Sequence, residues 1–368
     1  MKLLEINVVC GVKSTGRIAT EIAKEYEEKG YEVKIAYGRE TVPTEYQKYA
    51  VKIGSKLSIY YHAFMSRLFD NAGFYSKCAT RKFLKWANEY NPDVLWLHNL
   101  HGYYINIEVL FDWIKSRPNT EVKWTLHDCW AFTGHCTHFM MAGCNKWQEE
   151  CYKCPKKCDY PKSVFLDRSR ENYRKKKTMF TGVNKLTIYT PSEWLKKKVK
   201  KSFLNGYEVI VLPNKIDKEL FKYTESNFRN RYNIANDKKL IISVASSWTY
   251  SKGLDDLIEL SKMLDSEKYA VIAIGLSDKQ LQALPSTMIG VGLTDVKELV
   301  KAYSAADLLV STSKEETFGL TILEAASCGT KAIVYKDTAC EEVALNNGGR
   351  AVEMSVKAMY DAIIDFFS

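Results

Sequence analysis

The chain has 368 residues and a formal net charge of +9, and 46% of its residues are hydrophobic while 26% are charged. This length favours two domains over a single core, and the composition is that of a globular protein rather than a disordered or fibrous one. No apolar run is long enough to span a membrane, and the first residues lead directly into a strand-like segment without a signal peptide. We therefore expect a cytoplasmic protein whose positive charge favours an anionic partner.

The amino-terminal residues predict a βαβ unit. Leu3 to Val9 is a β-rich apolar run, a helical pattern starts near Gly16, and Tyr31 to Tyr37 is expected to form the next strand. This alternation implies a parallel sheet. The first loop, residues 11–17, matches neither a Walker loop nor a dinucleotide fingerprint. It is either a plain tight turn or a loop that faces a phosphate at a helix N-terminus.

Two further apolar runs end in polar clusters. Asp93 to His98 is followed closely by His101, and Glu121 to Leu126 runs into His127 and Asp128. Ligands of open α/β sheets bind at the carboxyl ends of strands, so these side chains are candidates for a site. The alternative for each histidine is a packed, hydrogen-bonded residue. Asp128 either orients its neighbour or caps the next element.

Six of the ten cysteines lie between Cys129 and Cys158. This clustering is unlike the disulfide framework of a small secreted domain. Four thiolates suit a closed tetrahedral zinc site, which would pin a loop too irregular to pack by itself. The four preferred ligands are Cys136, Cys144, Cys151 and Cys154. Free thiols or a disulfide are the alternatives.

A lysine-rich helix is predicted after the fifth predicted strand of this half, Lys185 to Tyr189. Ser192 suits its N-cap, and Leu195, Val199 and Phe203 recur every four residues, so one face is core and the others carry Lys196 to Lys201. The basic face is either solvated or contacts anionic lipid. Nucleic acid is disfavoured because no aromatic platforms lie between the charges.

Pro213 to Asp217 breaks the pattern, and a second α/β alternation follows it. We therefore predict an amino-terminal, acceptor-binding domain at 1–212, with the cysteine-rich loop at 129–158, and a second domain at 213–354. The last segment, 355–368, is expected to be a helix that folds back across either domain, with the amino-terminal domain as one option.

In the second half, Lys252 opens a helix directly after the strand from Leu240 to Ala245, so it can reach an anion at the sheet edge. Another strand, Asp307 to Thr312, is followed by a loop with Glu316 and by a helix that contains Glu324.

The start of that last helix, near Phe318 to Thr321, presents unpaired N–H groups, and Gly319 lets the backbone approach a ligand. A sugar nucleotide offers a phosphate for the N–H groups and hydroxyls for the two carboxylates. The alternative is a surface loop with solvated glutamates.

These stretches together resemble the retaining glycosyltransferase family 4. The matching carboxyl-half segments are Glu316 to Glu324, Tyr303 to Asp307, Pro213 to Asp217 and Val244 to Gly253. The amino half resembles the branch that builds bacterial capsule, exopolysaccharide and colanic-acid-type glycans, through Ser14 to Arg17, Leu97 to Gly102, Thr125 to Gly134 and the cysteine-rich loop.

The resemblance implies an α/β protein of the GT-B fold, with two Rossmann-like, doubly wound domains that face each other across a cleft. The carboxyl domain would bind a nucleotide-sugar donor and the amino domain the acceptor. It also implies transfer with retention of configuration and no catalytic divalent metal, so a structural Zn²⁺ is the one metal we expect.

The resemblance also implies roles for individual residues. Glu324 would bind the donor ribose, Glu316 the sugar hydroxyls and Lys252 the diphosphate, while His127 would lie near the transferred sugar. Backbone contacts to the donor would come from Phe318, Gly319, Leu320, Thr321 and, in the amino domain, Gly16, and we place His101 and Asp128 on the acceptor side. Two positions depart from the family: Ser246 or Ser247 replaces the usual arginine partner of Lys252, and Lys215 replaces a linker glycine.

The predicted function is that of a retaining hexosyltransferase that transfers sugar to a lipid-linked or oligosaccharide acceptor for a bacterial surface polysaccharide. We expect cytoplasmic protein, peripheral on the anionic inner face of the membrane, and no nucleic-acid partner. Two alternatives stay open. One is a GT-B sugar-nucleotide epimerase, which needs no acceptor, and the other is a zinc-organised module that binds polyanions or lipid.

Overall fold

The computed structural model describes residues 1–368, which form two compact units, unit 1 (Met1–Pro213) and unit 2 (Asn214–Ser368). The boundary between them falls one residue from the predicted position. No helix combines the length and the apolar character that crossing a bilayer requires.

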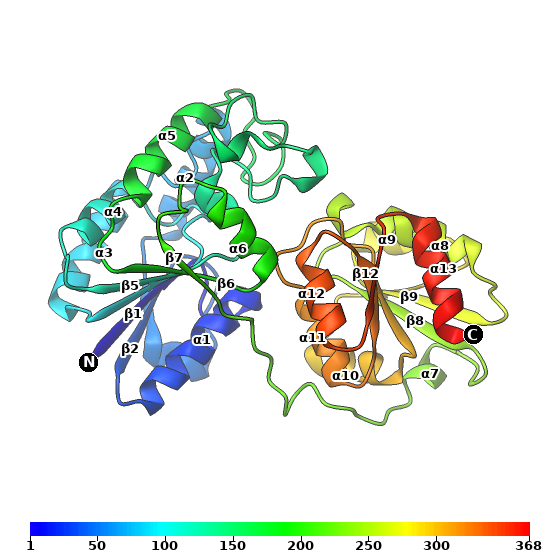
Figure 1. The fold of residues 1–368 in the computed structure, drawn as a ribbon. Coiled ribbons are helices and arrows are strands. Elements are labelled where there is room, and N and C mark those ends of the chain that lie inside the picture. The colour runs from blue at the N-terminus through cyan, green and yellow to red at the C-terminus, as the bar shows by residue number, and fades with distance from the viewer. The chain divides into compact units, whose positions relative to one another are not determined.

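Unit 1 is built on a seven-stranded parallel sheet in the order β3-β2-β1-β4-β5-β6-β7 (Figure 1). The predicted apolar runs form its central strands because they are buried on both faces, as parallel strands usually are. The strands are β1 (Lys2–Asn7), β2 (Glu32–Tyr37), β3 (Ala50–Lys52), β4 (Val94–Leu97), β5 (Glu121–Thr125), β6 (Leu186–Thr190) and β7 (Glu208–Val211).

Helices cover both faces of this sheet, with α1 on one side and α4 and α5 on the other (Figure 1). The helices are α1 (Lys13–Glu28), α2 (Lys56–Phe69), α3 (Lys77–Tyr90), α4 (Ile107–Lys115), α5 (Ser169–Phe180) and α6 (Glu193–Lys200). In α6 the predicted N-cap is confirmed, because the Ser192 hydroxyl accepts a hydrogen bond from the Leu195 N–H at 3.2 Å. Leu195 and Val199 are fully buried, as their spacing predicted.

Unit 2 contains a six-stranded parallel sheet in the order β10-β9-β8-β11-β12-β13. Its strands are β8 (Lys239–Val244), β9 (Tyr269–Leu276), β10 (Ile289–Gly292), β11 (Leu308–Ser311), β12 (Ala332–Tyr335) and β13 (Arg350–Val352). Its helices are α7 (Phe228–Arg231), α8 (Leu254–Met263), α9 (Asp278–Gln282), α10 (Val296–Ala305), α11 (Leu320–Ser327), α12 (Ala339–Asn346) and α13 (Val356–Phe367).

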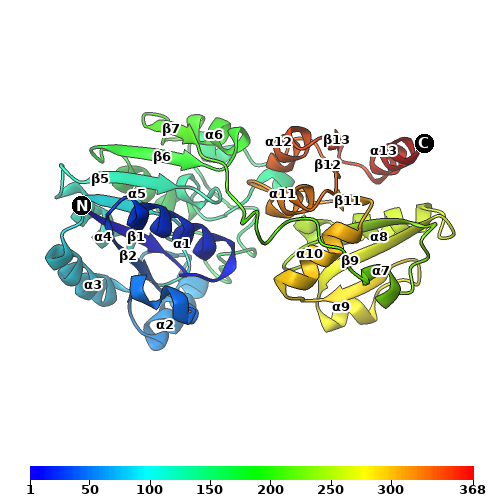
Figure 2. The same cartoon turned by 90° about the horizontal axis from the view of Figure 1, so that it is seen from below.

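The terminal helix packs on unit 2, one of the two domains that the sequence left open for it. Helix α13 packs on α8, β12 and β13 of unit 2, and Figure 2 shows it beside the end of β13. Met359 and Ile363 are fully buried there in one core cluster with Leu257 and Leu260. The apolar stripe of α13 therefore completes the core of unit 2 rather than covering unit 1.

Both sheets reverse their strand order at one point, which lies between β1 and β4 in unit 1 and between β8 and β11 in unit 2. Connections from these neighbouring strands leave in opposite directions, and ligands of open α/β sheets bind beyond the carboxyl ends of the strands at such a point. Of the predicted site residues, His101 follows β4, while Lys252 and Glu316 follow β8 and β11. His127 and Asp128 follow the neighbouring strand β5, and Gly16 and Glu324 lie within α1 and α11.

Candidate functional site

In unit 2, the loops after β8 and β11 bring Lys252 and Glu316 together in an ion pair at the switch point. The Thr312 hydroxyl ties these loops together by donating to the carbonyl oxygens of Lys252, at 3.2 Å, and Gly253, at 2.8 Å. Only glycine fits at position 253, where φ is +72° and a Cβ would lie 2.1 Å from the Thr312 oxygen. Thr312 and Gly253 thus hold the backbone of the two loops together, and this places Lys252 beside Glu316.

The Lys252 ammonium is held in its charged form. Burial acts against the charge, but Glu316 accepts a hydrogen bond from it and raises the pKa of Lys252 above its ordinary value. The two side chains are about three-quarters buried, with exposed fractions of 28% and 23%. A partly buried cation of this kind can bind a ligand anion strongly, because little water screens it.

Helix α11 starts where the sequence predicted, with Gly319 as its N-cap at a φ of +107°. A side chain at this position would clash with Ile322, since a Cβ would lie 2.9 Å from the Ile322 Cδ1 atom. Phe318 is buried in the core and anchors the turn, while Leu320 and Thr321 are half-buried. The unpaired N–H groups of the first turn are suited to a phosphate.

Glu324 lies one turn further along α11 and is buried. The Tyr303 hydroxyl of α10 donates a hydrogen bond of 2.9 Å to its Oε2 atom. Burial and the nearby carboxylate of Glu324 raise the pKa of Tyr303 well above its usual range, so the phenol keeps its proton. Tyr303 lay in a motif that sequence analysis had recognised, but its role in orienting Glu324 depends on a contact across two helices.

The missing arginine has no obvious substitute in unit 2. Ser246 and Ser247 are exposed, and the nearby Lys314 donates a hydrogen bond of 2.7 Å to Asp256 instead. Lys252 and the start of α11 are therefore the features at this edge of the sheet that are suited to an anion.

In unit 1, three side chains form a hydrogen-bonded row at the switch point. The Oε2 atom of Glu5, on β1, lies 2.9 Å from Nε2 of His98, and Nδ1 of His98 lies 3.2 Å from Nε2 of His127. The rings of His98 and His127 are also stacked, with centroids 5.4 Å apart. Both imidazoles are therefore fixed in orientation.

This row is electrically neutral. Burial lowers the pKa of His127 to about 4 and that of His98 well below its usual value, while burial raises the pKa of Glu5. The second carboxyl oxygen of Glu5 has no hydrogen-bond partner. Sequence analysis overlooked Glu5, although an acidic residue inside the apolar strand Leu3 to Ile6 was a visible signal.

The predicted acceptor-side residues His101 and Asp128 also lie together, with Nε2 of His101 2.7 Å from Oδ2 of Asp128. The other ring nitrogen of His101 lies 3.1 Å from the Tyr160 hydroxyl. Although burial favours its neutral form, the hydrogen bond and charge of His101 keep the pKa of Asp128 below its ordinary value. Asp128 thus orients an imidazole, as expected, but the imidazole is that of His101.

Gly16 lies in the first turn of α1 and is buried. A Cβ there would lie 3.1 Å from Val9 and 3.2 Å from the Gly11 nitrogen, so glycine is needed for close packing. Its contact with a donor stays a prediction.

The cysteine-rich loop has a packed interior that includes aromatic rings and a buried lysine. Phe132, Phe139 and Trp147 form a buried aromatic cluster, and the buried Lys176 of α5 donates to the carbonyl oxygens of Trp130, at 2.8 Å, and Thr133, at 3.1 Å.

The proposed thiolates are only partly gathered. Cys136 and Cys154 share a hydrogen bond, but the structure contains no group of three or more His, Cys, Asp or Glu side chains that could hold a metal ion. A zinc site at Cys136, Cys144, Cys151 and Cys154 therefore gains no support and stays a prediction.

Residues 224–368 match the family model described as glycosyl transferases group 1, and this range spans almost all of unit 2. Unit 2 is a group 1 glycosyltransferase domain. Its match includes Lys252, Glu316 and Glu324, so the residues at the switch point lie inside the domain that defines the family.

The chain is 24% identical over 366 residues to the "Putative colanic acid biosynthesis glycosyl transferase WcaC" of Escherichia coli (strain K12), with 96% of this chain and 87% of that protein aligned. Solved structures confirm the predicted GT-B fold. The match to sucrose-phosphate synthase from Thermosynechococcus elongatus has a TM-score of 0.71 at 15% identity, and it covers 100% of this chain and 89% of the synthase chain.

Anabaena HepE, solved in complex with UDP-glucose, has a TM-score of 0.63 at 14% identity and covers 100% of this chain and 90% of its own.

Proposed function

We propose that the protein is a retaining glycosyltransferase that moves a sugar from a nucleotide-sugar donor to a glycan or lipid-linked acceptor in the synthesis of a bacterial surface polysaccharide. The observation that carries this proposal is the Lys252–Glu316 ion pair beside the start of α11 in a group 1 glycosyltransferase domain. The similarity to the colanic acid protein supports the polysaccharide assignment.

In unit 2, a positive side chain and the start of a helix bind the negatively charged diphosphate of the donor. The diphosphate lies on the N–H groups that follow Phe318 and on the Lys252 ammonium, which neutralises the charge that develops on the leaving group. Once the diphosphate binds, Lys252 no longer depends on Glu316 alone, so the Glu316 carboxylate can accept hydrogen bonds from the sugar hydroxyls. Glu324, oriented by Tyr303, accepts hydrogen bonds from the ribose.

The transfer step breaks the bond between the sugar C1 atom and the diphosphate oxygen. An acceptor hydroxyl forms the new C1–O bond on the same face, and its proton passes to the departing phosphate oxygen. This same-face route needs no carboxylate nucleophile and no catalytic metal. In unit 1, the neutral His127 supplies a hydrogen bond to the transferred sugar, and Glu5 and His98 fix its ring. We place the enzyme in the cytoplasm, peripheral on the inner face of the membrane, where the basic side of α6 contacts anionic lipid.

Calorimetry of the full chain with a panel of sugar nucleotides tests the proposal. We expect one nucleotide sugar to bind the parent protein, and Lys252→Ala and Glu324→Ala to weaken that binding by about 10- to 100-fold, as loss of charged hydrogen bonds usually does. Lys357→Ala removes an ion-paired lysine from α13 and serves as the control. Unchanged donor affinity in both site variants would contradict the proposal.

Product analysis completes the test. With acceptor present, the product should keep the anomeric configuration of the donor, and a chelator should leave the rate unchanged. Sugar epimerisation without an acceptor would instead identify an epimerase.

A further inference from the structure

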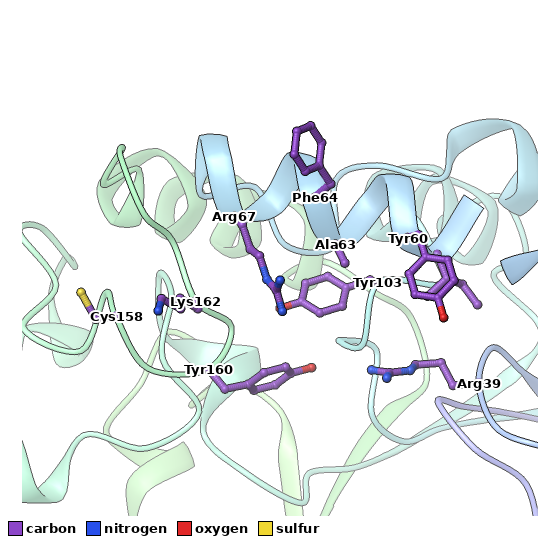
Figure 3. A pocket seen from close by; sticks show the side chains of 10 residues that line it. Arg39, Tyr60, Ala63, Phe64, Arg67, Tyr103, Cys158, Tyr160 and Lys162 are labelled. Carbon is purple, nitrogen blue, oxygen red and sulfur yellow. The ribbon is translucent and has the colours of Figure 1, made fainter. Parts of the chain in front are cut away.

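Unit 1 contains a cavity of about 670 Å³ that lies apart from the histidine row and that no role described so far explains. Its walls come from four segments: Arg39 just after β2, helix α2, Tyr103 in the loop after β4, and the loop at residues 158–162 (Figure 3). Three cationic side chains line it, Arg39, Arg67 and Lys162, and no aspartate or glutamate does.

Glu40, the acidic neighbour of Arg39, is paired with Lys13 rather than with the cations of this cavity. Arg39, Arg67 and Lys162 take part in no ion pair within residues 1–368. Figure 3 shows the two guanidinium groups pointing into the space beside the rings of Tyr103 and Tyr160. A guanidinium group can donate two parallel hydrogen bonds to phosphate oxygens. Two arginines and a lysine that form no ion pair are therefore suited to a phosphate or diphosphate.

The tyrosines connect the cavity with the acceptor-side residues. The Tyr160 hydroxyl lies 3.1 Å from His101, which in turn contacts Asp128, and the rings of Tyr103 and Tyr160 meet edge to face at 6.0 Å. Tyr103 has a φ of +69°, an uncommon conformation for a bulky residue that is typical of functional sites. Such rings can stack on a sugar.

The rim of the cavity is apolar and exposed. Phe64 points away from the cations on the outer side of α2 (Figure 3) and is 60% exposed, and Tyr60 is 70% exposed. Beside them on α2, Leu57 is 80% exposed, and Phe165, in the segment that bonds to the end of α2 through Val164 and Arg67, is 69% exposed. Exposed apolar side chains next to a cationic cavity fit an amphiphile better than a free phosphate.

We propose that this cavity binds the phosphate or diphosphate group of a lipid-linked acceptor, whose hydrocarbon chain lies over the exposed face of α2. The inference rests on the proposed function and names the chemical class of its acceptor. Arg39 and Arg67 bind the phosphate oxygens, Tyr160 contacts the first sugar, and the apolar residues of α2 bind the chain at the membrane surface.

Calorimetry of the full chain with farnesyl diphosphate, inorganic pyrophosphate and farnesol tests the inference. We expect farnesyl diphosphate to bind at least 10-fold more tightly than either of the other two, because each carries only one half of the recognised chemistry. Arg39→Ala and Arg67→Ala should each weaken farnesyl diphosphate binding by 10-fold or more, whereas Phe64→Ser should weaken farnesyl diphosphate but not pyrophosphate.

The control is Arg81→Ala, which removes an exposed arginine from α3, and sugar-nucleotide binding is measured on every variant. Farnesyl diphosphate affinity equal to that of the parent in both arginine variants would overturn the inference. Pyrophosphate binding as tight as that of farnesyl diphosphate would also overturn it. Intact donor binding beside either result would leave the proposed function standing, while a parent that binds no sugar nucleotide would contradict the proposed function alone.

Discussion

The two units share one architecture, but at the point where the strand order reverses one unit places charged side chains and the other places neutral ones. Beyond β8 and β11, unit 2 places the charged pair Lys252 and Glu316. Beyond β4 and β5, unit 1 places buried imidazoles that carry no charge at neutral pH, held by a carboxyl group on β1. The strand order reverses in both cases, so the fold alone does not decide the chemistry. Charge in unit 2 suits a diphosphate, whereas fixed neutral donors and acceptors in unit 1 suit hydroxyl groups.

The largest expected effect comes from His127→Ala. If unit 1 serves the reacting sugar and unit 2 the donor charge, this variant should lose on the order of 100-fold in kcat, the usual cost of one aligned hydrogen-bonding group in a transition state. Its calorimetric donor affinity should stay within about twofold of the parent, because Lys252 and Glu324 still bind the nucleotide. A drop in donor affinity as large as that of Lys252→Ala would contradict the proposal that unit 1 acts on the reacting sugar while unit 2 binds the donor.

The start of α11 should be sensitive to a single methyl group. Gly319→Ala should lower the free energy of unfolding by about 2–3 kcal/mol, since it adds the clash with Ile322 to the strain of a positive φ. The matched control is Gly329→Ala at the other end of the helix, where φ is +94° and no atom lies within 4 Å of the added Cβ. That control should cost only about 1 kcal/mol. Urea unfolding of the two variants gives the comparison, and equal losses would show that the close packing at Gly319 carries no energy.

The neutral row of unit 1 should make stability depend on pH. The pKa of His127 is about 4 in the folded chain, below the value of about 6.5 for an unfolded histidine. Because the folded value is lowered, the unfolded chain binds more protons between these two pH values, and stability falls as pH is lowered through that window.

From pH 7.5 to 5.5 the parent should therefore lose on the order of 1 kcal/mol more stability than His127→Asn, which has no proton to bind at this position. Urea titrations at both pH values measure the difference. If the two proteins lose stability equally, His127 is not kept neutral by the fold.

A smaller effect is expected from Tyr303→Phe, which removes the hydrogen bond to Glu324. Donor affinity should fall by about fivefold, equivalent to about 1 kcal/mol, because Glu324 keeps its charge but loses its orientation. Tyr335→Phe removes a phenol of the same unit that bonds Asp256 at 2.9 Å and is the control. Equal affinity in Tyr303→Phe and the parent would show that packing alone orients Glu324.

Much of the architecture was predictable because buried parallel strands form continuous apolar runs, as at Leu3 to Val9 and Asp307 to Thr312. Residues that act within one loop, such as Gly319, were also predictable. Helix α2 was not predicted, because Leu57, Tyr60 and Phe64 are apolar residues on its exposed face and do not mark a buried stripe.

Contacts between distant segments could not be read from local patterns. Glu5 and His98 lie 93 positions apart along the chain, and the cationic cavity takes its walls from four separate segments. Each of its residues is unremarkable alone, and only the fold places the three cations in one cavity.

The packing of α13 has a consequence for experiments on the donor half. Since Met359 and Ile363 complete the core of unit 2, residues 214–368 contain all the apolar surface that their own core needs. Removal of the last helix should therefore damage the integrity of unit 2 before it affects anything in unit 1. The carboxyl-terminal residues are, in this sense, a structural part of unit 2.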